Sequence, residues 1–351
     1  MDPELWLQAM QGYMAPVSTP EGFTSREIVR CAIEFDDPPR IPYSFMDPLT
    51  SDFVELGVIA SPGGGSDSPR AAKGEMVVDN WGVGHRSTGR LCGHAEEYPL
   101  ADLDNLATYE FPAIIDPERM KACELVAAKA HEVGKYVVAC DLVGTIERLR
   151  GLLGFENMLE AMYLDRERFD ILVDKLTDMT IEVVQAYARM GNVDGFMTYQ
   201  DWGLQSQLQI RPEHWRDIFK PSYARIAKAC HDFGMHYIWH CCGYILDIVP
   251  DMIAIGVDVL QLDQPRLMTY ETLTEKFGGK ICFWNMVDIQ WSARKEVTPE
   301  EIKTDVKGMV AQFNRFGGGF MARQYPAWTD IELTPEKNHA MVEAFMEHGC
   351  A

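Results

Sequence analysis

From residue 117 to the C-terminus, short apolar segments alternate with longer helical stretches, most of which end at glycine. Strands that are apolar on both faces are typical of a parallel sheet covered by helices, and glycine favours the left-handed residue that ends many helices. The alternation therefore predicts an α/β fold. With two strands added upstream, the predicted strands lie near residues 41, 76, 136, 195, 236, 259, 281 and 319, and the main predicted helices cover 117–133, 146–163, 166–190, 212–233, 244–255, 299–316 and 335–348.

Eight β/α units over this length favour a (β/α)8 TIM barrel in a single domain, residues 1–351, with an N-terminal helical extension and an insertion near 60–115. The extension has Thr24 and Glu27 at capping-box spacing before a short amphipathic helix. An open doubly wound sheet is the alternative. A dinucleotide-binding fold is rejected, because the glycines at 63–65 lie in a loop with no strand-to-helix context.

The composition is that of an ordinary globular protein with an excess of acidic residues. Hydrophobic residues make up 47% of the 351 residues, and 32 basic against 53 acidic residues give a formal charge of −21. This charge disfavours nucleic acid, anionic membranes and polyanionic substrates. No run approaches the ~20 apolar residues that span a bilayer. The acidic N-terminus does not resemble a signal peptide, and nine scattered cysteines indicate reduced thiols, so a cytoplasmic protein is expected.

Polar residues collect where the predicted strands end. In a (β/α)8 barrel these ends form the mouth at which active sites lie, so the residues there are the candidate site. A single strand-end aspartate often only caps the following helix, and this alternative holds for Asp141 and Asp263 in particular. The strand-end residues are Asp47, Asp79, Asn80, Trp81, Asp141, Tyr199, Gln200, Asp201, Trp202, His240, Cys241, Cys242, Asp263, Asn285, Met286, Asp288, Gln324 and Tyr325.

His240 and Cys242 are separated by one residue at the end of a predicted strand. Side chains at i and i+2 point to the same side, so both are expected to face the barrel mouth while Cys241 faces the helices. Imidazole and thiolate are ligands that Zn²⁺ prefers. The alternative is a buried histidine beside inert thiols. Gly243, which opens a turn directly afterwards, favours a site.

Five segments at consistent spacing carry a family resemblance. They are TSREIVRCAIEFDDPPRIP (24–42), DNWGVGHR (79–86), EEYPLADLDNLATYEFP (96–112), YQDWGLQSQLQIRPEHWRDIFKPSYARI (199–226) and HYIWHCCGYILDIVPDMIAIGVDVLQLDQP (236–265). Together they resemble the uroporphyrinogen decarboxylase superfamily, and within it the corrinoid-dependent methyltransferases. The decarboxylases themselves are less similar, because the Arg-rich N-terminal segment that binds their polycarboxylate substrate is absent.

The resemblance implies that His240 and Cys242 are zinc ligands. It also implies that the protein moves a methyl group from a small methylated substrate, such as a methoxylated aromatic, to the cobalt of a partner corrinoid protein. No corrinoid-binding Asp-x-His-x-x-Gly motif occurs, so cobalamin would come from that partner. Coenzyme M methyltransferases of this group supply a third ligand from a Pro-Gly-Cys segment, but residues 322–335 contain no cysteine. Either no metal binds or another donor completes the site, and the candidate donors are Gln324, Tyr325, Asp201 and Glu332.

For this reaction Asp201 and His240 are the predicted catalytic residues, which polarise the ether oxygen of the substrate. Aromatic residues at the strand ends suit a flat ring, with barrel packing as the alternative. Three other functions stay open: transfer from a methylcobamide to a thiol such as coenzyme M, decarboxylation of a porphyrinogen-like substrate, and a barrel that only binds a corrinoid or its carrier. The oligomeric state is not predicted. The predicted substrate-binding residues are Tyr199, Trp202, Trp284, Asn285, Gln324 and Tyr325.

Overall fold

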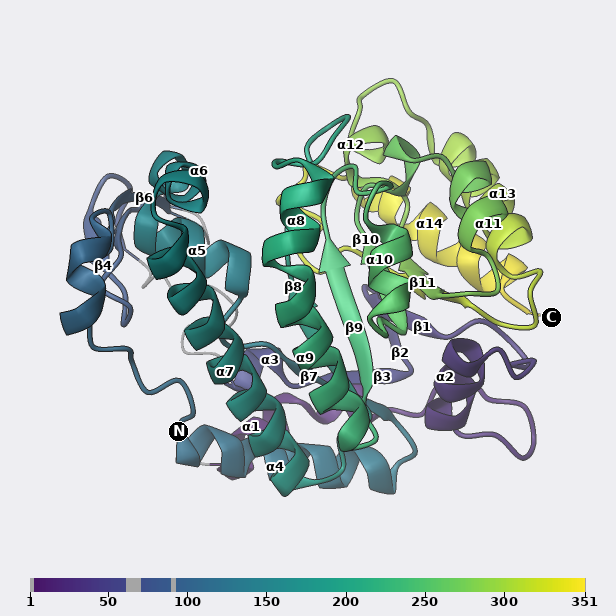
Figure 1. Ribbon diagram of the computed structural model, residues 1–351. Coiled ribbons are helices and arrows are strands. Elements are labelled where there is room, and N and C mark those ends of the chain that lie inside the picture. The colour runs from purple at the N-terminus through teal and green to yellow at the C-terminus, as the bar shows by residue number, and fades with distance from the viewer. Residues whose placement is uncertain (1–2, 61–70, 90–92, 351) are drawn as a thin grey trace.

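The centre of the molecule is a barrel-like sheet with helices on its outside (Figure 1). The computed structural model describes residues 3–60, 71–89 and 93–350. In this part of the chain nine strands form the sheet, in the order β2 (Leu49–Ser51), β1 (Tyr43–Met46), β12 (Phe320–Arg323), β11 (Cys282–Asn285), β10 (Val259–Leu262), β9 (His236–Cys241), β8 (Gly195–Tyr199), β7 (Tyr136–Cys140) and β3 (Phe53–Glu55). All neighbours in this order are parallel except β1 and β2. The predicted α/β barrel is confirmed.

Helices connect most strands and cover the outer face of the sheet. The predicted capping box is present: the Thr24 hydroxyl accepts a hydrogen bond from the backbone of Glu27, whose carboxylate accepts one from the backbone of Thr24. In the described residues no helix is long and apolar enough to cross a membrane. The helices are α1 (Pro3–Ala9), α2 (Ser25–Glu34), α3 (Gly57–Ala60), α4 (Pro117–Glu132), α5 (Thr145–Leu153), α6 (Phe155–Leu164), α7 (Arg166–Met190), α8 (Pro212–Ile218), α9 (Lys220–Asp232), α10 (Val249–Ala254), α11 (Tyr270–Phe277), α12 (Ile289–Ser292), α13 (Pro299–Phe313) and α14 (Pro335–His348).

Helix α2 closes the amino-terminal end of the barrel. Its apolar face packs against the inward-facing side chains of the strands, and the amide of Gly319, just before β12, donates to the Ala32 carbonyl at 2.7 Å. The resulting inner core is apolar apart from one tyrosine hydroxyl, one indole N–H and one thiol, so the carboxyl ends of the strands are left as the functional face. This inner core consists of Val29, Ala32, Ile33, Phe53, Tyr136, Val138, Met197, Ile238, Val259, Cys282, Trp284 and Met321.

The second strand of the barrel differs from the prediction. The segment near residue 76 is a strand, β4 (Met76–Val78), but it pairs with β5 (Gly84–Arg86), which in turn pairs with β6 (His94–Glu97), in a separate antiparallel sheet within the predicted insertion. The barrel position belongs to β3, which is three residues long and follows β2 without a helix. No helix separates β2 from β3, so the alternation of apolar strands and helices that identified the other strands is missing here.

Two predicted helices are broken, and each break has a local cause. The stretch 146–163 divides into α5 and α6 at Gly154, which has φ of +80°. The stretch 212–233 divides at Phe219, because Pro221 has no backbone N–H to continue the hydrogen-bond ladder of α8. The stretch 244–255 begins as turns, and α10 forms only from Val249 onward.

Ion pairs join the two ends of the sheet, where β1 and β3 lie without a backbone ladder between them. Arg323 at the end of β12 makes a two-pronged ion pair with Glu55 at the end of β3, at 2.9 and 3.1 Å. Arg40 and Asp52 form a second pair at 2.7 and 2.8 Å, with side chains only 6% and 0% exposed. We infer that these charges fix the closure of the barrel.

Candidate metal site and active site

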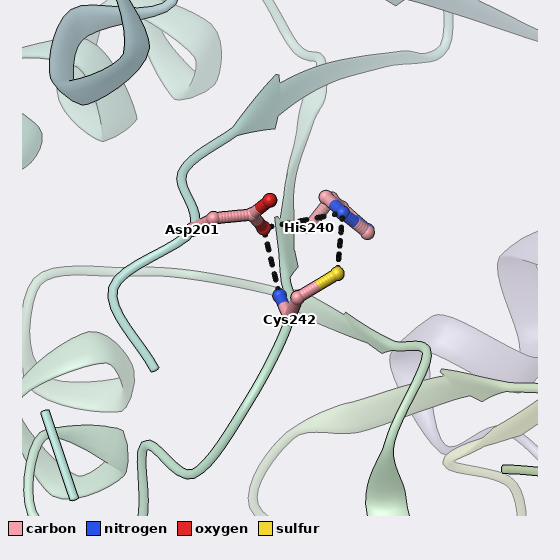
Figure 2. A group of neighbouring side chains, drawn as sticks. All are labelled: Asp201, His240 and Cys242. Atoms are coloured by element: carbon pink, nitrogen blue, oxygen red, sulfur yellow. Dashed lines mark hydrogen bonds and ion pairs between the residues drawn. The ribbon is translucent and has the colours of Figure 1, made fainter. Parts of the chain in front are cut away.

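Three side chains with metal-binding atoms meet at the carboxyl ends of β8 and β9, as Figure 2 shows. One ligand atom each from Asp201, His240 and Cys242 lies within 4.8 Å of the others. His240 Nε2 is 3.4 Å from Asp201 Oδ1 and 3.7 Å from Cys242 Sγ. The two residues chosen from strand spacing are thus joined by Asp201, one of the four proposed third donors.

The sequence brings these three residues together through a close backbone contact. A Cβ atom on Gly243, which has φ of +82°, would lie 2.4 Å from the carbonyl carbon of Gly203. The Tyr244 amide donates to the Leu204 carbonyl at 2.7 Å. The loops after β8 and β9 can approach so closely only because Gly203 and Gly243 both lack a side chain. As a result, the Cys242 amide reaches the Asp201 carboxylate at 2.8 Å.

The alternation of side chains at the end of β9 is as predicted. Cys241 is fully buried in the outer layer, where its sulfur lies 3.4 Å from the Trp202 amide. His240 and Cys242 instead point to the same side of the chain, with Cys242 Sγ 3.7 Å from His240 Nε2 (Figure 2). Strand geometry therefore separates one buried, packed thiol from one thiol at the candidate site.

The donor set fits a zinc ion. Nitrogen, oxygen and sulfur ligands at ordinary zinc distances, ~2.0–2.3 Å, stand about 3.4 Å (N to O) and about 3.6 Å (N to S) apart around a tetrahedral ion. The corresponding atoms here are 3.4 and 3.7 Å apart. Three protein ligands also leave a fourth position open, which is typical of catalytic rather than structural zinc sites.

Burial and neighbouring charges shift the pKa values of all three residues. Burial by itself would raise the pKa of Asp201, but the hydrogen bond and charge of His240 and the Cys242 amide lower that pKa to about 2. Burial would lower the pKa of His240, but Asp263 and Asp201 raise that pKa well above its usual range. Burial raises the pKa of the Cys242 thiol to about 12, although the His240 hydrogen bond opposes this. Asp201 is therefore an anion in the neutral range and not a proton donor.

Two further polar residues of β10 and its end lie behind His240. Gln261 Oε1 contacts His240 Nδ1, and Gln261 Nε2 donates to Asp263 Oδ1 at 2.8 Å. The second carboxylate oxygen of Asp263 is 3.9 Å from Cys242 Sγ. Gln261 was not predicted, although its inward position follows from its register opposite His240. Asp263 is not a simple helix cap, because its side chain contacts these site residues.

Among the predicted substrate-binding residues, Tyr199 lies beside the described site. Its ring centroid is 5.5 Å from that of His240, and the residue is 38% exposed. Tyr325 is half-buried just beyond β12. Substrate binding by Tyr199 and Tyr325 stays a proposal. The other four predicted substrate-binding residues are buried away from the candidate ligands or bound to the backbone.

The structure corrects the prediction for Trp202, Trp284 and Gln324. Trp202 is fully buried in the outer layer, where its Nε1 donates to the Tyr223 hydroxyl at 3.1 Å. Trp284 is fully buried in the inner core, with the Arg323 guanidinium stacked 4.4 Å from its ring. The Gln324 amide is bound to the Asp47 backbone at 2.9 and 3.0 Å. These residues build the barrel and do not reach a substrate at its mouth.

Asn285 is also fully buried, and both of its amide atoms lack a hydrogen-bond partner in the described residues. It occupies the same register level as Leu262 and Ala322, which belong to the outer core, so it does not point into the barrel. This position does not support the predicted contact of Asn285 with substrate, which stays a prediction.

The cap alternative is correct for Asp141. Its two carboxylate oxygens accept hydrogen bonds from the Val143 and Gly144 amides, at 2.9 and 3.1 Å, in the turn that precedes α5. Burial raises the pKa of Asp141 to about 6, against these backbone hydrogen bonds. Asp79 is likewise bound to its own turn in the insertion, through the Trp81 and Val83 amides. Neither residue contacts the three candidate ligands.

The fold and this group of side chains define an α/β barrel with a candidate metal centre at the carboxyl ends of its strands. The profile of the Uroporphyrinogen decarboxylase (URO-D) family matches residues 94–348. The chain belongs to the uroporphyrinogen decarboxylase family, as its motifs predicted. No curated protein sequence matches the chain significantly.

Two solved structures show the range of similarity to this chain. A methyltransferase from Methanosarcina mazei superposes with a TM-score of 0.62 at 15% identity, covering 93% of this chain and 99% of that one. A D-psicose 3-epimerase from Clostridium cellulolyticum H10 gives a TM-score of 0.41 at 9% identity, covering 71% of this chain and 88% of its own. The first likeness establishes a shared architecture over nearly the whole length of both chains.

Proposed function

We propose that this protein is a zinc-dependent methyltransferase that moves a methyl group from a small methylated substrate, such as a methoxylated aromatic, to the cobalt of a partner corrinoid protein. The observation that carries the proposal is the donor set of Asp201, His240 and Cys242 at the barrel mouth. The His-x-Cys-Gly motif at 240–243 resembles that of corrinoid-dependent methyltransferases. The structural neighbour described as a methyltransferase agrees with this choice within the family.

Zinc bound by the three residues would act as a Lewis acid on the substrate atom that carries the methyl group and so make it a better leaving group. Asp201, ionised at neutral pH, would hold the ion and limit its charge. The exposed ring of Tyr199 beside His240 would orient a flat substrate. The methyl group itself would leave toward the carboxyl end of the barrel, where a corrinoid protein would dock.

A decarboxylase acting on a polycarboxylate is less well supported. Such a substrate needs cationic side chains at the barrel mouth, but the inward-facing Arg323 is already bound to Glu55 through two hydrogen bonds. The formal charge of −21 also repels a polyanion. A thiol acceptor such as coenzyme M remains the alternative within the methyltransferases, and the direct test is to supply both kinds of substrate.

The test is an anaerobic assay with zinc-loaded protein and free cob(I)alamin, in which methylcobalamin formation is followed by absorbance. Methoxyphenols, methylamines and methyl thioethers serve as donors, and methylcobalamin with coenzyme M tests the reverse direction. We expect turnover with a methoxyphenol that is lost when zinc is removed by a chelator. If neither direction gives turnover above the rate of the chelated enzyme, the proposed function is wrong.

Substitution of the two neighbouring cysteines should have opposite results. Cys242→Ser replaces the thiolate ligand by a weak hydroxyl donor and should abolish tight zinc binding and activity. Cys241→Ser should bind zinc like the unsubstituted protein, because the Cys241 sulfur is buried in the outer layer. Zinc stoichiometry after dialysis measures both variants. Equal losses in the two variants would contradict the assignment of Cys242 as a ligand.

Zinc affinity should rise with pH. In the absence of metal, His240 and Cys242 both carry protons in the neutral range, because the pKa of His240 is raised and that of Cys242 is about 12. Both protons must leave when the side chains bind metal, whereas Asp201, with a pKa of about 2, has none to lose. Between about pH 6 and 8, affinity should therefore increase by up to ~100-fold per pH unit. Chelator competition measures it, and a flat profile would contradict this ligand set.

A further inference from the structure

A buried glutamine lies directly behind the candidate ligand His240. Gln261 is on β10 in register with His240 on β9, and it is only 1% exposed. An uncharged amide inside a barrel is costly unless both of its ends are hydrogen-bonded. Both ends are satisfied here: Oε1 contacts His240 Nδ1, and Nε2 donates to Asp263 Oδ1 at 2.8 Å.

The orientation of the Gln261 amide is fixed by Asp263. A carboxylate accepts hydrogen bonds and donates none, so it selects the NH2 end of the amide. The amide oxygen must then face His240 Nδ1, where it accepts a hydrogen bond from an Nδ1–H group. The reverse orientation would place the amide oxygen against the carboxylate of Asp263 and is repulsive.

This hydrogen bond determines which nitrogen of His240 can bind a metal. A neutral imidazole carries one proton, so a proton on Nδ1 leaves a free lone pair on Nε2. Nε2 is the nitrogen that lies 3.4 Å from Asp201 Oδ1 and 3.7 Å from Cys242 Sγ. The lone pair is therefore directed to the point where the other two donors converge.

We propose that Gln261, held by Asp263, is a positioning residue that fixes the tautomer and ring orientation of His240 so that Nε2 is the metal-binding nitrogen. The inference rests on the metal site of the proposed function and is independent of the methyl donor. Partners of this kind behind a histidine ligand commonly contribute 10–100-fold to metal affinity. The second oxygen of Asp263 lies 3.9 Å from Cys242 Sγ. This carboxylate therefore contacts one candidate ligand directly and the other through Gln261.

The experiment compares Gln261→Leu with a double variant that restores the network. Gln261→Leu removes the acceptor for Nδ1–H and should weaken zinc binding by about 10–100-fold. In Gln261→Glu/Asp263→Asn, the introduced amide can donate to the introduced carboxylate, which still accepts from His240, so affinity should largely return. Thr198→Val, which removes a buried hydroxyl of β8 bound to the Tyr237 hydroxyl, is the matched control.

Three readouts distinguish positioning from a general loss of structure. Chelator competition gives the zinc affinity, the visible spectrum of the cobalt(II)-substituted protein reports the ligand geometry, and urea unfolding reports stability. We expect Gln261→Leu to change affinity and the cobalt spectrum, and the double variant to restore both. If Gln261→Leu leaves the zinc affinity and the cobalt spectrum unchanged while the unsubstituted protein binds zinc, the role proposed for Gln261 is overturned and the metal site is not. Absence of zinc binding by the unsubstituted protein would overturn the metal site itself.

Discussion

Asp201→Asn should reduce the rate of methyl transfer by at least about 100-fold, because a neutral amide oxygen is a much poorer zinc ligand than a carboxylate and would leave the Lewis-acid ion poorly held beside the leaving group. The substitution keeps the shape of the side chain. The amide oxygen of asparagine can still accept the Cys242 N–H bond, which is 2.8 Å long in the present structure. The loss therefore reports the carboxylate of Asp201 and not a collapse of the loop.

Asp141→Asn is the matched control for this prediction. Asp141 also ends a barrel strand, but its carboxylate caps the turn before α5 and does not contact the candidate ligands. Asparagine is nearly as good a cap, so the rate should change by no more than a few-fold. Single-turnover methyl transfer with excess zinc measures both variants. A rate for Asp201→Asn within about threefold of the unsubstituted enzyme would exclude Asp201 from the chemistry.

Asp52→Ala should lower the free energy of unfolding by about 3–5 kcal/mol, because it leaves the buried Arg40 cation without its partner. Asp52 is fully buried and accepts hydrogen bonds from the Ser25 hydroxyl at 2.6 Å, from the Tyr43 amide at 2.8 Å and from Arg40. These contacts join α2, β1 and β3 where the sheet lacks a backbone ladder. Urea unfolding followed by tryptophan fluorescence measures the change.

An ion pair on the surface provides the control for Asp52→Ala. Asp174 pairs with Arg225 at 3.0 Å, but its side chain is 68% exposed. Asp174→Ala should therefore alter stability by no more than about 1 kcal/mol. Similar losses in Asp52→Ala and Asp174→Ala would show that the Arg40–Asp52 pair does not stabilise the closure of the barrel.

The fold could be predicted where the sequence repeats a local rule. From β7 to β12, apolar strands alternate with helices, and each strand lies close to its predicted position. The positions of His240 and Cys242 also followed from local geometry, because side chains alternate along an extended strand. Prediction failed at β3, which is three residues long and is held by ion pairs between residues distant in sequence.

The rest of the site depends on contacts that local patterns do not encode. Asp201 joins His240 and Cys242 because Gly203 and Gly243 allow two loops to touch. Trp202 was misplaced because it was chosen as an aromatic residue near a strand end; it lies three residues beyond Tyr199, the last residue of β8, and its side chain is on the outer side, against Tyr223. Gln261 was missed because a single glutamine within an apolar strand carries no motif, and its meaning depends on its register with His240.

The central claim is that Asp201, His240 and Cys242 together bind zinc, and anomalous X-ray diffraction from zinc-equilibrated crystals tests it most directly. Data collected on both sides of the zinc absorption edge identify the element and locate it. The account predicts one zinc peak per chain, bonded to a carboxylate oxygen of Asp201, to His240 Nε2 and to Cys242 Sγ, at distances of about 2.0–2.3 Å. Crystals with no zinc peak among these three atoms, or with His240 bound through Nδ1, would contradict it.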